Sequence, residues 1–324
     1  MTNFQVYKRT LSFSFIMFLV DLLAMAIVIG TCTGGYFIMN QSNDRAVIGL
    51  GIGLVIGIII VVLLQIFVGN RIKAAQIAMM TKGVVENKLP DNVFHEGFNE
   101  ISGRFGSITV FFLITHLIKG VFRQIGRGLD KIGRAVGGDV GEGVTSAINS
   151  AIQVLIGYLC DCCLGWILYR KDENPFKAGC EGAVIFFKHG KTLIRNIGRI
   201  FGMGFVSLAV IGGAFFGIFY AIYSQFPQMF ESLSIEIIEM ANRNDWQVQE
   251  WITNPTNLTL FIAAISGIVL WSALHSVLIR PFILVGVLRN FMTAGIKDIP
   301  TEQDFAELDK YPRFAKMHDK YKSA

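Results

Sequence analysis

The hydrophobic positions of this chain gather into long, nearly uninterrupted stretches. Residues 11–39 and 46–69 form a first pair joined by a short polar turn, and residues 201–223 and 258–278 form a second pair joined by a longer polar segment. Each stretch reaches the ~20 apolar residues that an α-helix needs to cross a bilayer. The pattern therefore predicts two hairpins of membrane-spanning helices.

The central part of the chain is apolar but irregular. Residues 105–120 are barely long enough to cross a bilayer, and residues 144–169 are apolar again but contain Asp161 among three cysteines. The glycine-rich sequence GGDVGEG separates the two stretches. Backbone that breaks at membrane depth is tolerated only where it is buried in protein or lines a cavity. We therefore expect a broken or re-entrant segment with a cavity near Asp161; two further full spans are the alternative.

Two basic stripes flank the central segment at helical spacing. In each stripe a cation recurs every three or four residues, and aliphatic residues hold the opposite face of the first stripe. This pattern is typical of a helix that lies along a membrane surface, with its cations towards anionic headgroups. A calmodulin-type target helix is the alternative for the first stripe. The expected lipid contacts are Lys119, Arg123, Arg127, Lys131 and Arg134 in the first stripe, and Lys188, Lys191, Arg195 and Arg199 in the second.

Composition favours a helical membrane protein. Hydrophobic residues make up 52% of the chain and charged residues 16%, and the formal net charge is +5. The 34 glycines against 7 prolines favour closely packed helices over an outer-membrane barrel. Because the basic residues lie beside the apolar stretches, we expect anionic membrane lipids as partners and no nucleic acid. The predicted fold class is an all-α polytopic membrane protein.

The distribution of charge gives the expected topology. Cytoplasmic segments of membrane proteins carry an excess of Lys and Arg. This bias places both termini and both basic stripes in the cytoplasm, and the turn at 40–45 and the acidic segment 225–257 outside. The expected organisation is an N-terminal hairpin (1–70), a cytoplasmic amphipathic segment and loop (71–104), the central region (105–200), a C-terminal hairpin (201–290) and a cytoplasmic tail (291–324).

Four ionisable side chains fall within or beside the apolar stretches. A charge in hydrocarbon is costly unless it is paired, so each is a candidate substrate or ion site. Aromatic faces beside a carboxylate can hold an organic cation by cation–π attraction. Structural hydrogen bonds and the aromatic belts of membrane proteins are the alternative explanations. The candidates are Asp21, His116, Asp161 and His275, with Tyr158 and Trp166 as the aromatic neighbours.

Glycines recur every four residues in the second apolar stretch, at Gly49, Gly53 and Gly57. Small residues at this spacing let two helices approach closely in a membrane. We therefore expect this stripe to pack against another helix, with a pore lining as the alternative.

Cys160, Cys162 and Cys163 are clustered near the end of an apolar stretch. Cysteines beside cations at a membrane interface are candidates for palmitoylation. Simple packing and binding of a soft metal are the alternatives, but the spacing is not that of a zinc site, so we expect no metal. The chain also contains no P-loop, dinucleotide-binding fingerprint, HExxH or GxSxG motif. We therefore expect no enzyme and no cofactor.

The segment FGSITVFFLITHLIKGVFRQIGRGL, followed by CDCCLGWIL and AVIFFKHGKTLIRN, resembles the choline-transporter-like family over about residues 105–200. The resemblance implies a helical transporter of choline or a related amine. The matching positions are Gly106, Ser107, Ile108, Cys160, Cys162, Cys163, Trp166, Ala183, Leu193, Arg195 and Asn196.

Two functions are expected for such a chain. The first is a small transporter or channel-like protein for an organic cation such as choline, in which Asp161 and Asp21 serve as coupling or counter-charge residues. The second is a membrane scaffold or complex subunit that does not transport and that binds or shapes the bilayer through basic amphipathic helices. In either case we expect a homo-oligomer or association with other membrane subunits.

Overall fold

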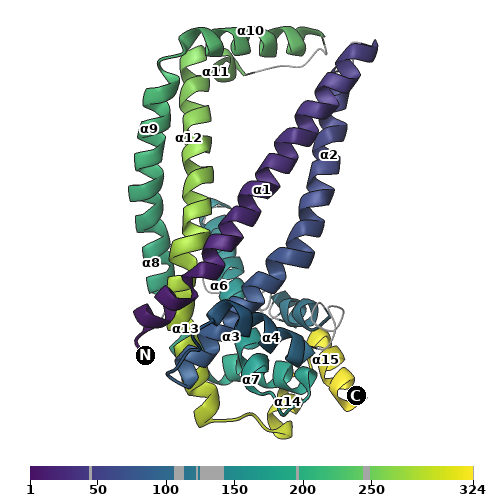
Figure 1. The fold of residues 1–324 in the computed structure, drawn as a ribbon, viewed down its shortest axis with the longest axis vertical. Helices are drawn as coiled ribbons and strands as arrows, with labels where there is room; N and C mark the ends of the chain where they lie inside the picture. The colour runs from purple at the N-terminus through teal and green to yellow at the C-terminus, as the bar shows by residue number, and fades with distance from the viewer. Residues whose placement is uncertain are drawn as a thin grey trace. The chain divides into compact units, whose positions relative to one another are not determined.

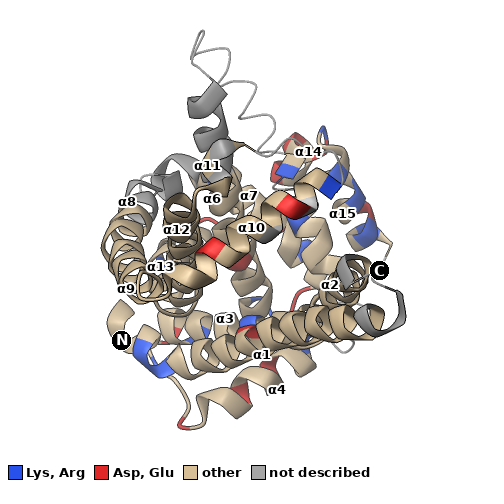
Figure 2. Cartoon of the chain, turned by 90° about the horizontal axis from the view of Figure 1, so that it is seen from above, with Lys and Arg blue, Asp and Glu red and all other residues tan. Residues whose placement is uncertain are grey.

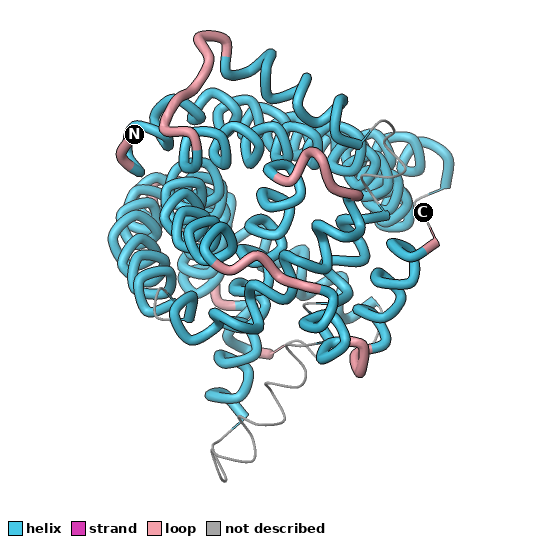
Figure 3. Tube along the Cα trace, turned by 90° about the horizontal axis from the view of Figure 1, so that it is seen from below, coloured by secondary structure: helices cyan, strands magenta, loops and turns pink. Residues whose placement is uncertain are grey.

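A computed structural model of the chain describes residues 1–43, 46–105, 113–121, 123–124, 142–194, 197–243 and 249–323. Every secondary-structure element in these ranges is helical, and short loops join the helices (Figures 1 and 3). The predicted all-α fold is confirmed for these residues. The chain divides into two compact units, one formed by Met1–Arg199 with Arg280–Ala324 and the other by Ile200–Ile279.

The first unit begins with a long helical hairpin. Helices α1 (Asn3–Asn43) and α2 (Ala46–Leu64) lie side by side in Figure 1, and α2 continues through the π-helical turn η1 (Gln65–Gly69) into α3 (Asn70–Val85). The glycine stripe of α2 faces α1, because a Cβ added at any of its three positions would meet backbone or side-chain atoms of α1. Such close approach of two backbones is the usual role of small residues in membrane helices.

A packed helix cluster adjoins this hairpin in the first unit. Its core contains large side chains that are fully buried, among them Trp166, Phe291, Phe305, Phe314 and Met317. The amphipathic segment expected at 71–104 contributes Ile77, Met79 and Met80 to this core. The cluster consists of α3, α4 (Val93–Phe105), α6 (Glu142–Tyr169), α7 (Pro175–Ile194), α13 (Arg280–Lys297), α14 (Glu302–Leu308) and α15 (Pro312–Lys322).

The second unit is a hairpin with a cap. Helix α8 (Ile197–Ser207) leads through the π-turn η2 (Leu208–Gly212) into α9 (Gly213–Tyr223), which packs against α12 (Pro255–Leu274) (Figure 1). At Gly267 the two backbones come so close that a Cβ would lie 2.9 Å from the amide nitrogen of Phe216. Between these helices in sequence come α10 (Pro227–Arg243) and the short α11 (Glu250–Thr253), and η3 (His275–Ile279) follows α12.

Four helical segments are apolar and long enough to cross a membrane: Asn3–Met39, Ile48–Val85, Gly202–Tyr223 and Pro255–Lys297. Figure 2 shows few charged residues along α1 and many on α14 and α15. These four segments support the predicted integral membrane protein with two apolar hairpins. The cytoplasmic location of the termini stays a prediction.

The predicted broken or re-entrant central segment is not confirmed in the described residues. Helix α6 runs without interruption from Glu142 to Tyr169, and its apolar part, Gln153–Tyr169, is shorter than the four candidate spans. Within this helix the backbone is unbroken at Asp161, and the neighbouring side chains are buried in the helix cluster. The glycine-rich residues 137–141 lie outside the described residues. A fold-back there, or two full spans, stays a prediction.

We expect Gly53→Ala to destabilise the protein by about 1–3 kcal/mol, because the added methyl group collides with the backbone of Thr31 and Cys32 on α1. Gly51→Ala is the matched control, since Gly51 lies two residues away and has no atom within 4 Å of the position of a Cβ. Thermal unfolding of the purified protein in detergent measures both. Equal melting temperatures for the two variants would contradict the role of the stripe in packing.

Candidate functional site

Asp161 is the centre of an ion-pair cluster in the first unit. Its side chain is only 6% exposed. One carboxylate oxygen accepts from Nζ of Lys73 at 2.7 Å, and the other accepts from Nη2 of Arg280 at 3.0 Å. Both oxygens are therefore engaged by cations, as a buried carboxylate requires.

The three residues come from three helices of the helix cluster. Lys73 lies in the first turn of α3, just after the apolar residues of α2 and η1, and Arg280 is the first residue of α13. Asp161 lies in the second half of α6. Because α13 packs against both α3 and α6, the double ion pair joins the helices at the places where two apolar stretches end.

Tyr158 lies one helical turn before Asp161 and is buried. Its ring faces the guanidinium of Arg280, whose Cζ atom is 5.8 Å from the ring centroid. This distance is typical of a cation–π contact. The aromatic face predicted to attract an organic cation therefore already has a cation of the protein beside it.

The ion-pair cluster around Asp161 contains more positive than negative charges. Lys73 and Arg280 keep 32% and 37% of their side chains exposed. Two further cations, Lys119 and Arg123, are exposed and lie in the vicinity of Cys160. We call Lys73, Lys119, Arg123 and Arg280, with the carboxylate of Asp161, the cationic cluster. A positively charged substrate at Asp161 would have to displace a cation and meet repulsion from the others.

Trp166 lies in the core of the helix cluster, with 0% of its surface exposed. Its Nε1 donates to Glu181 at 2.8 Å, and Nε of Arg170 donates to the same carboxylate oxygen at 3.1 Å. Glu181 is itself only 1% exposed. The indole therefore belongs to a buried polar network between α6 and α7, and Glu181 and Arg170 gave no signal of this in the sequence.

The remaining ionisable candidates are Asp21, His116 and His275, and each has its own surroundings. Asp21 of α1 accepts a hydrogen bond from Nε2 of Gln65 in η1 at 2.8 Å. His116 is exposed and lies in the same short helical stretch as Lys119. His275 begins η3 in the second unit, and its ring centroid is 5.2 Å from that of Trp271.

Cys160, Cys162 and Cys163 are buried, with 6%, 0% and 0% of their surface exposed. Acylation of these thiols would require α6 to separate from the helices packed on it. The structure therefore favours the packing interpretation of the three cysteines. Among the described residues, no three His, Cys, Asp or Glu side chains gather closely enough to hold a metal ion.

The second basic stripe contacts protein where the structure describes it. Nζ of Lys188 lies 2.8 Å from Asp304 and 3.6 Å from Asp298. In the first stripe Lys119 and Arg123 are exposed. The side chains of Lys191 and Arg199 lie outside the described part of the structure, as do Gly106, Ser107, Ile108, Arg127, Lys131, Arg134, Arg195 and Asn196.

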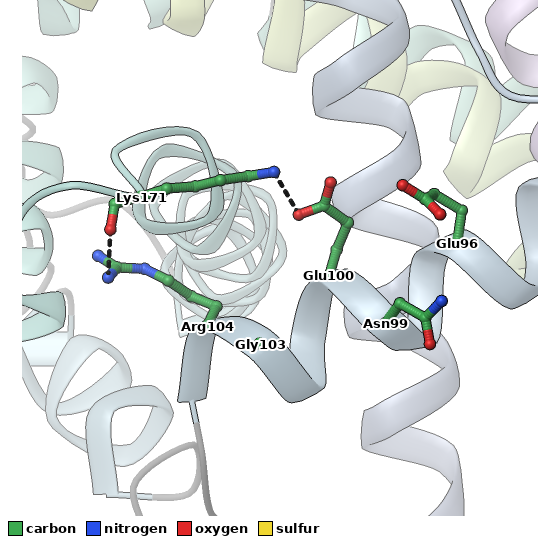
Figure 4. Close-up of a pocket in the computed structure, with 6 residues that line it drawn as sticks. All are labelled: Glu96, Asn99, Glu100, Gly103, Arg104 and Lys171. Carbon is green, nitrogen blue, oxygen red and sulfur yellow. Dashed lines mark hydrogen bonds and ion pairs between the residues drawn. The ribbon is translucent and has the colours of Figure 1, made fainter.

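An open cleft of about 370 Å³ lies beside α4 (Figure 4). Arg104 donates to the backbone oxygens of Ile167, Arg170 and Lys171 at 2.8, 2.9 and 3.2 Å, and so caps the C-terminus of α6. Lys171 in turn pairs with Glu100. Arg104 and the Lys171–Glu100 pair therefore attach α4 to the end of α6, while Glu96 and Glu100 also pair with Lys82 of α3. Its lining is Glu96, Asn99, Glu100, Gly103, Arg104 and Lys171.

No protein-family model, curated protein or solved structure matches this chain. The resemblance to the choline-transporter-like family therefore stays a prediction.

We expect Asp161→Asn to destabilise the protein by roughly 2 kcal/mol, because Lys73 and Arg280 would lose their shared anion and repel each other. This is below the ~3–5 kcal/mol for breaking a fully buried pair, since both cations are partly exposed. Asp91→Asn, at an exposed carboxylate 4.0 Å from Arg9, is the control and should change stability little. Thermal unfolding in detergent measures the melting temperatures of the two variants. Equal values for Asp161→Asn and Asp91→Asn would refute the role of the ion pair in stability.

The ion pair of Lys188 with Asp304 predicts a pH dependence. The hydrogen bond from Lys188, followed by that from the backbone of Thr301, lowers the pKa of Asp304 below its ordinary value of 3.8. A lowered pKa in the folded state means that the pair stabilises the protein above pH 3.8, and that this stability is lost as the pH falls through the folded-state pKa.

Lys188→Gln should therefore cost up to about 1 kcal/mol at pH 7 and much less near pH 3. The measurement is the difference in melting temperature between the variant and the wild type at both pH values. Lys316→Gln, another lysine of the first unit, controls for the loss of a positive charge. A difference for Lys188→Gln that does not shrink at low pH would exclude the titration of Asp304 as its cause.

Proposed function

We propose that this chain is a membrane scaffold, or a subunit of a larger membrane complex, that holds the bilayer surface through its cationic cluster and does not transport a solute. The observation that carries the proposal is the double ion pair of Asp161. A transporter of an organic cation needs a carboxylate that can exchange an internal partner for the substrate. Here both oxygens of the best candidate are held by cations that belong to the helix cluster itself.

The environment of Asp21 supports the same proposal. Its hydrogen bond from Gln65 links α1 to the end of the second apolar stretch within one hairpin. A carboxyl group at membrane depth needs such a polar partner whether or not it has a function in transport. The contact therefore gives Asp21 a structural role that requires no substrate.

The helix cluster also suits a protein that holds partners in place. Its helices are joined by buried polar contacts, such as that of Glu181 with Trp166 and Arg170, and by the cap that Arg104 places on α6. Groups satisfied in this way stabilise one arrangement of the helices. A rigid body at the end of long apolar helices can present a constant surface to another membrane subunit.

Uptake by reconstituted vesicles tests the proposal. We expect vesicles that contain the wild-type protein to take up radiolabelled choline, tetraethylammonium and a mixture of biogenic amines no faster than protein-free vesicles. Native gel electrophoresis of gently solubilised membranes from the source cells should place the chain in an assembly larger than the chain in its detergent micelle.

Transport remains the rival prediction. Saturable uptake that Asp161→Asn or Asp21→Asn abolishes, and that the exposed control Asp91→Asn leaves unchanged, would refute the scaffold and establish a transporter. Migration of the chain only as a single copy in its micelle would also count against the proposal.

A further inference from the structure

We propose that the cationic cluster binds the phosphate group of an anionic phospholipid. The inference rests on the proposed function and names the ligand by which this surface would hold the bilayer. It concerns Lys73 and Arg280, which lie outside both basic stripes of the sequence.

The two central cations have hydrogen-bond donors to spare. An ammonium group carries three N–H donors and a guanidinium carries five. Among the described residues, Asp161 is the only hydrogen-bonded acceptor for either Lys73 or Arg280. About a third of each side chain is exposed, at 32% and 37%, so the ion pair borders the surface of the helix cluster.

Asp161 positions these donors. Both cations lie within hydrogen-bond distance of one carboxylate, at 2.7 and 3.0 Å, so the ammonium and the guanidinium are held close to each other. A phosphate has several oxygens and can accept from two such groups at once, and the planar guanidinium suits it particularly well. The carboxylate itself offsets only one of the two charges, and the exposed Lys119 and Arg123 add two more.

The position of the site along the chain favours a lipid over free phosphate. Lys73 follows closely after the apolar residues 46–69, and Arg280 follows directly after residues 258–278, so each cation lies where an apolar stretch of ~20 residues ends within a longer candidate span. Phe67 and Val68, one to two turns before Lys73 on the same continuous helix, are 51% and 39% exposed. Apolar surface beside phosphate-binding cations suits a ligand that has an acyl chain next to its headgroup.

Ligand-dependent thermal shift of the purified full chain in detergent tests the inference. The probes are dioctanoyl phosphatidylglycerol, dioctanoyl phosphatidylcholine and inorganic phosphate, each titrated separately. A ligand that binds the folded state raises the melting temperature in proportion to its occupancy. We expect phosphatidylglycerol to act at the lowest concentration, phosphatidylcholine only at a much higher one, and inorganic phosphate in between or not at all.

Three variants connect the effect to the residues. The triple variant Lys73→Gln, Asp161→Asn, Arg280→Gln removes the charges together and so leaves no buried carboxylate unpaired. It should raise the half-saturating concentration of phosphatidylglycerol about tenfold. Lys119→Gln, at an exposed side chain, should raise the half-saturating concentration of phosphatidylglycerol about threefold. This variant provides the test if the triple variant does not fold. Arg243→Gln, at a 78% exposed arginine of α10, is the matched control and should change nothing.

Each outcome is decisive. Equal effects of the two phospholipids would overturn the inference. So would an unchanged half-saturating concentration of phosphatidylglycerol in every variant of the cluster that folds, including Lys119→Gln alone. If inorganic phosphate acts as strongly as phosphatidylglycerol and the variants abolish both effects, the site binds phosphate and the lipid is the wrong source. None of these outcomes changes the uptake of amines by vesicles, so the failure of the lipid site is distinguishable from the failure of the scaffold.

Discussion

A carboxylate taken out of water must be paired, and the first unit of this protein is organised by that requirement. Asp161 satisfies it with Lys73 and Arg280, and the three residues belong to α6, α3 and α13. The same requirement recurs nearby at Glu181, which pairs with Trp166 and Arg170 between α6 and α7. The second half of α6 is therefore held by charged hydrogen bonds, and apolar side chains of the core pack around them.

The cationic cluster depends on this constraint, and the proposed scaffold function is argued from it. One carboxylate is enough to hold two cations together but too little to neutralise them and the exposed Lys119 and Arg123 beside them. The surplus of positive charge makes the site a poor place for a choline-like substrate and a good place for an anion. The residue that first pointed to cation transport is thus the residue that assembles a site for the opposite charge.

Local patterns in the sequence were enough for the membrane-spanning hairpins, because the length of an apolar stretch and the spacing of Gly49, Gly53 and Gly57 depend on neighbouring residues alone. The partners of Asp161 could not be predicted in this way. Arg280 lies 119 residues further along the chain, and in isolation it is only a cation at the end of an apolar stretch. Trp166 was interpreted as an aromatic neighbour of a substrate because its acceptor, Glu181, comes from the next helix.

The residues of the core are synthesised at different times, and this order bears on how the protein folds. Helices α3 and α6 leave the ribosome early, so Lys73 and Asp161 can meet while the second hairpin is still being synthesised. Arg280 and the buried side chains of Phe291, Phe305, Phe314 and Met317 arrive only afterwards. Until then α6 presents part of an incomplete apolar core and a carboxylate with one of its two partners. Exposed apolar surface of this kind makes a partly synthesised chain prone to aggregation.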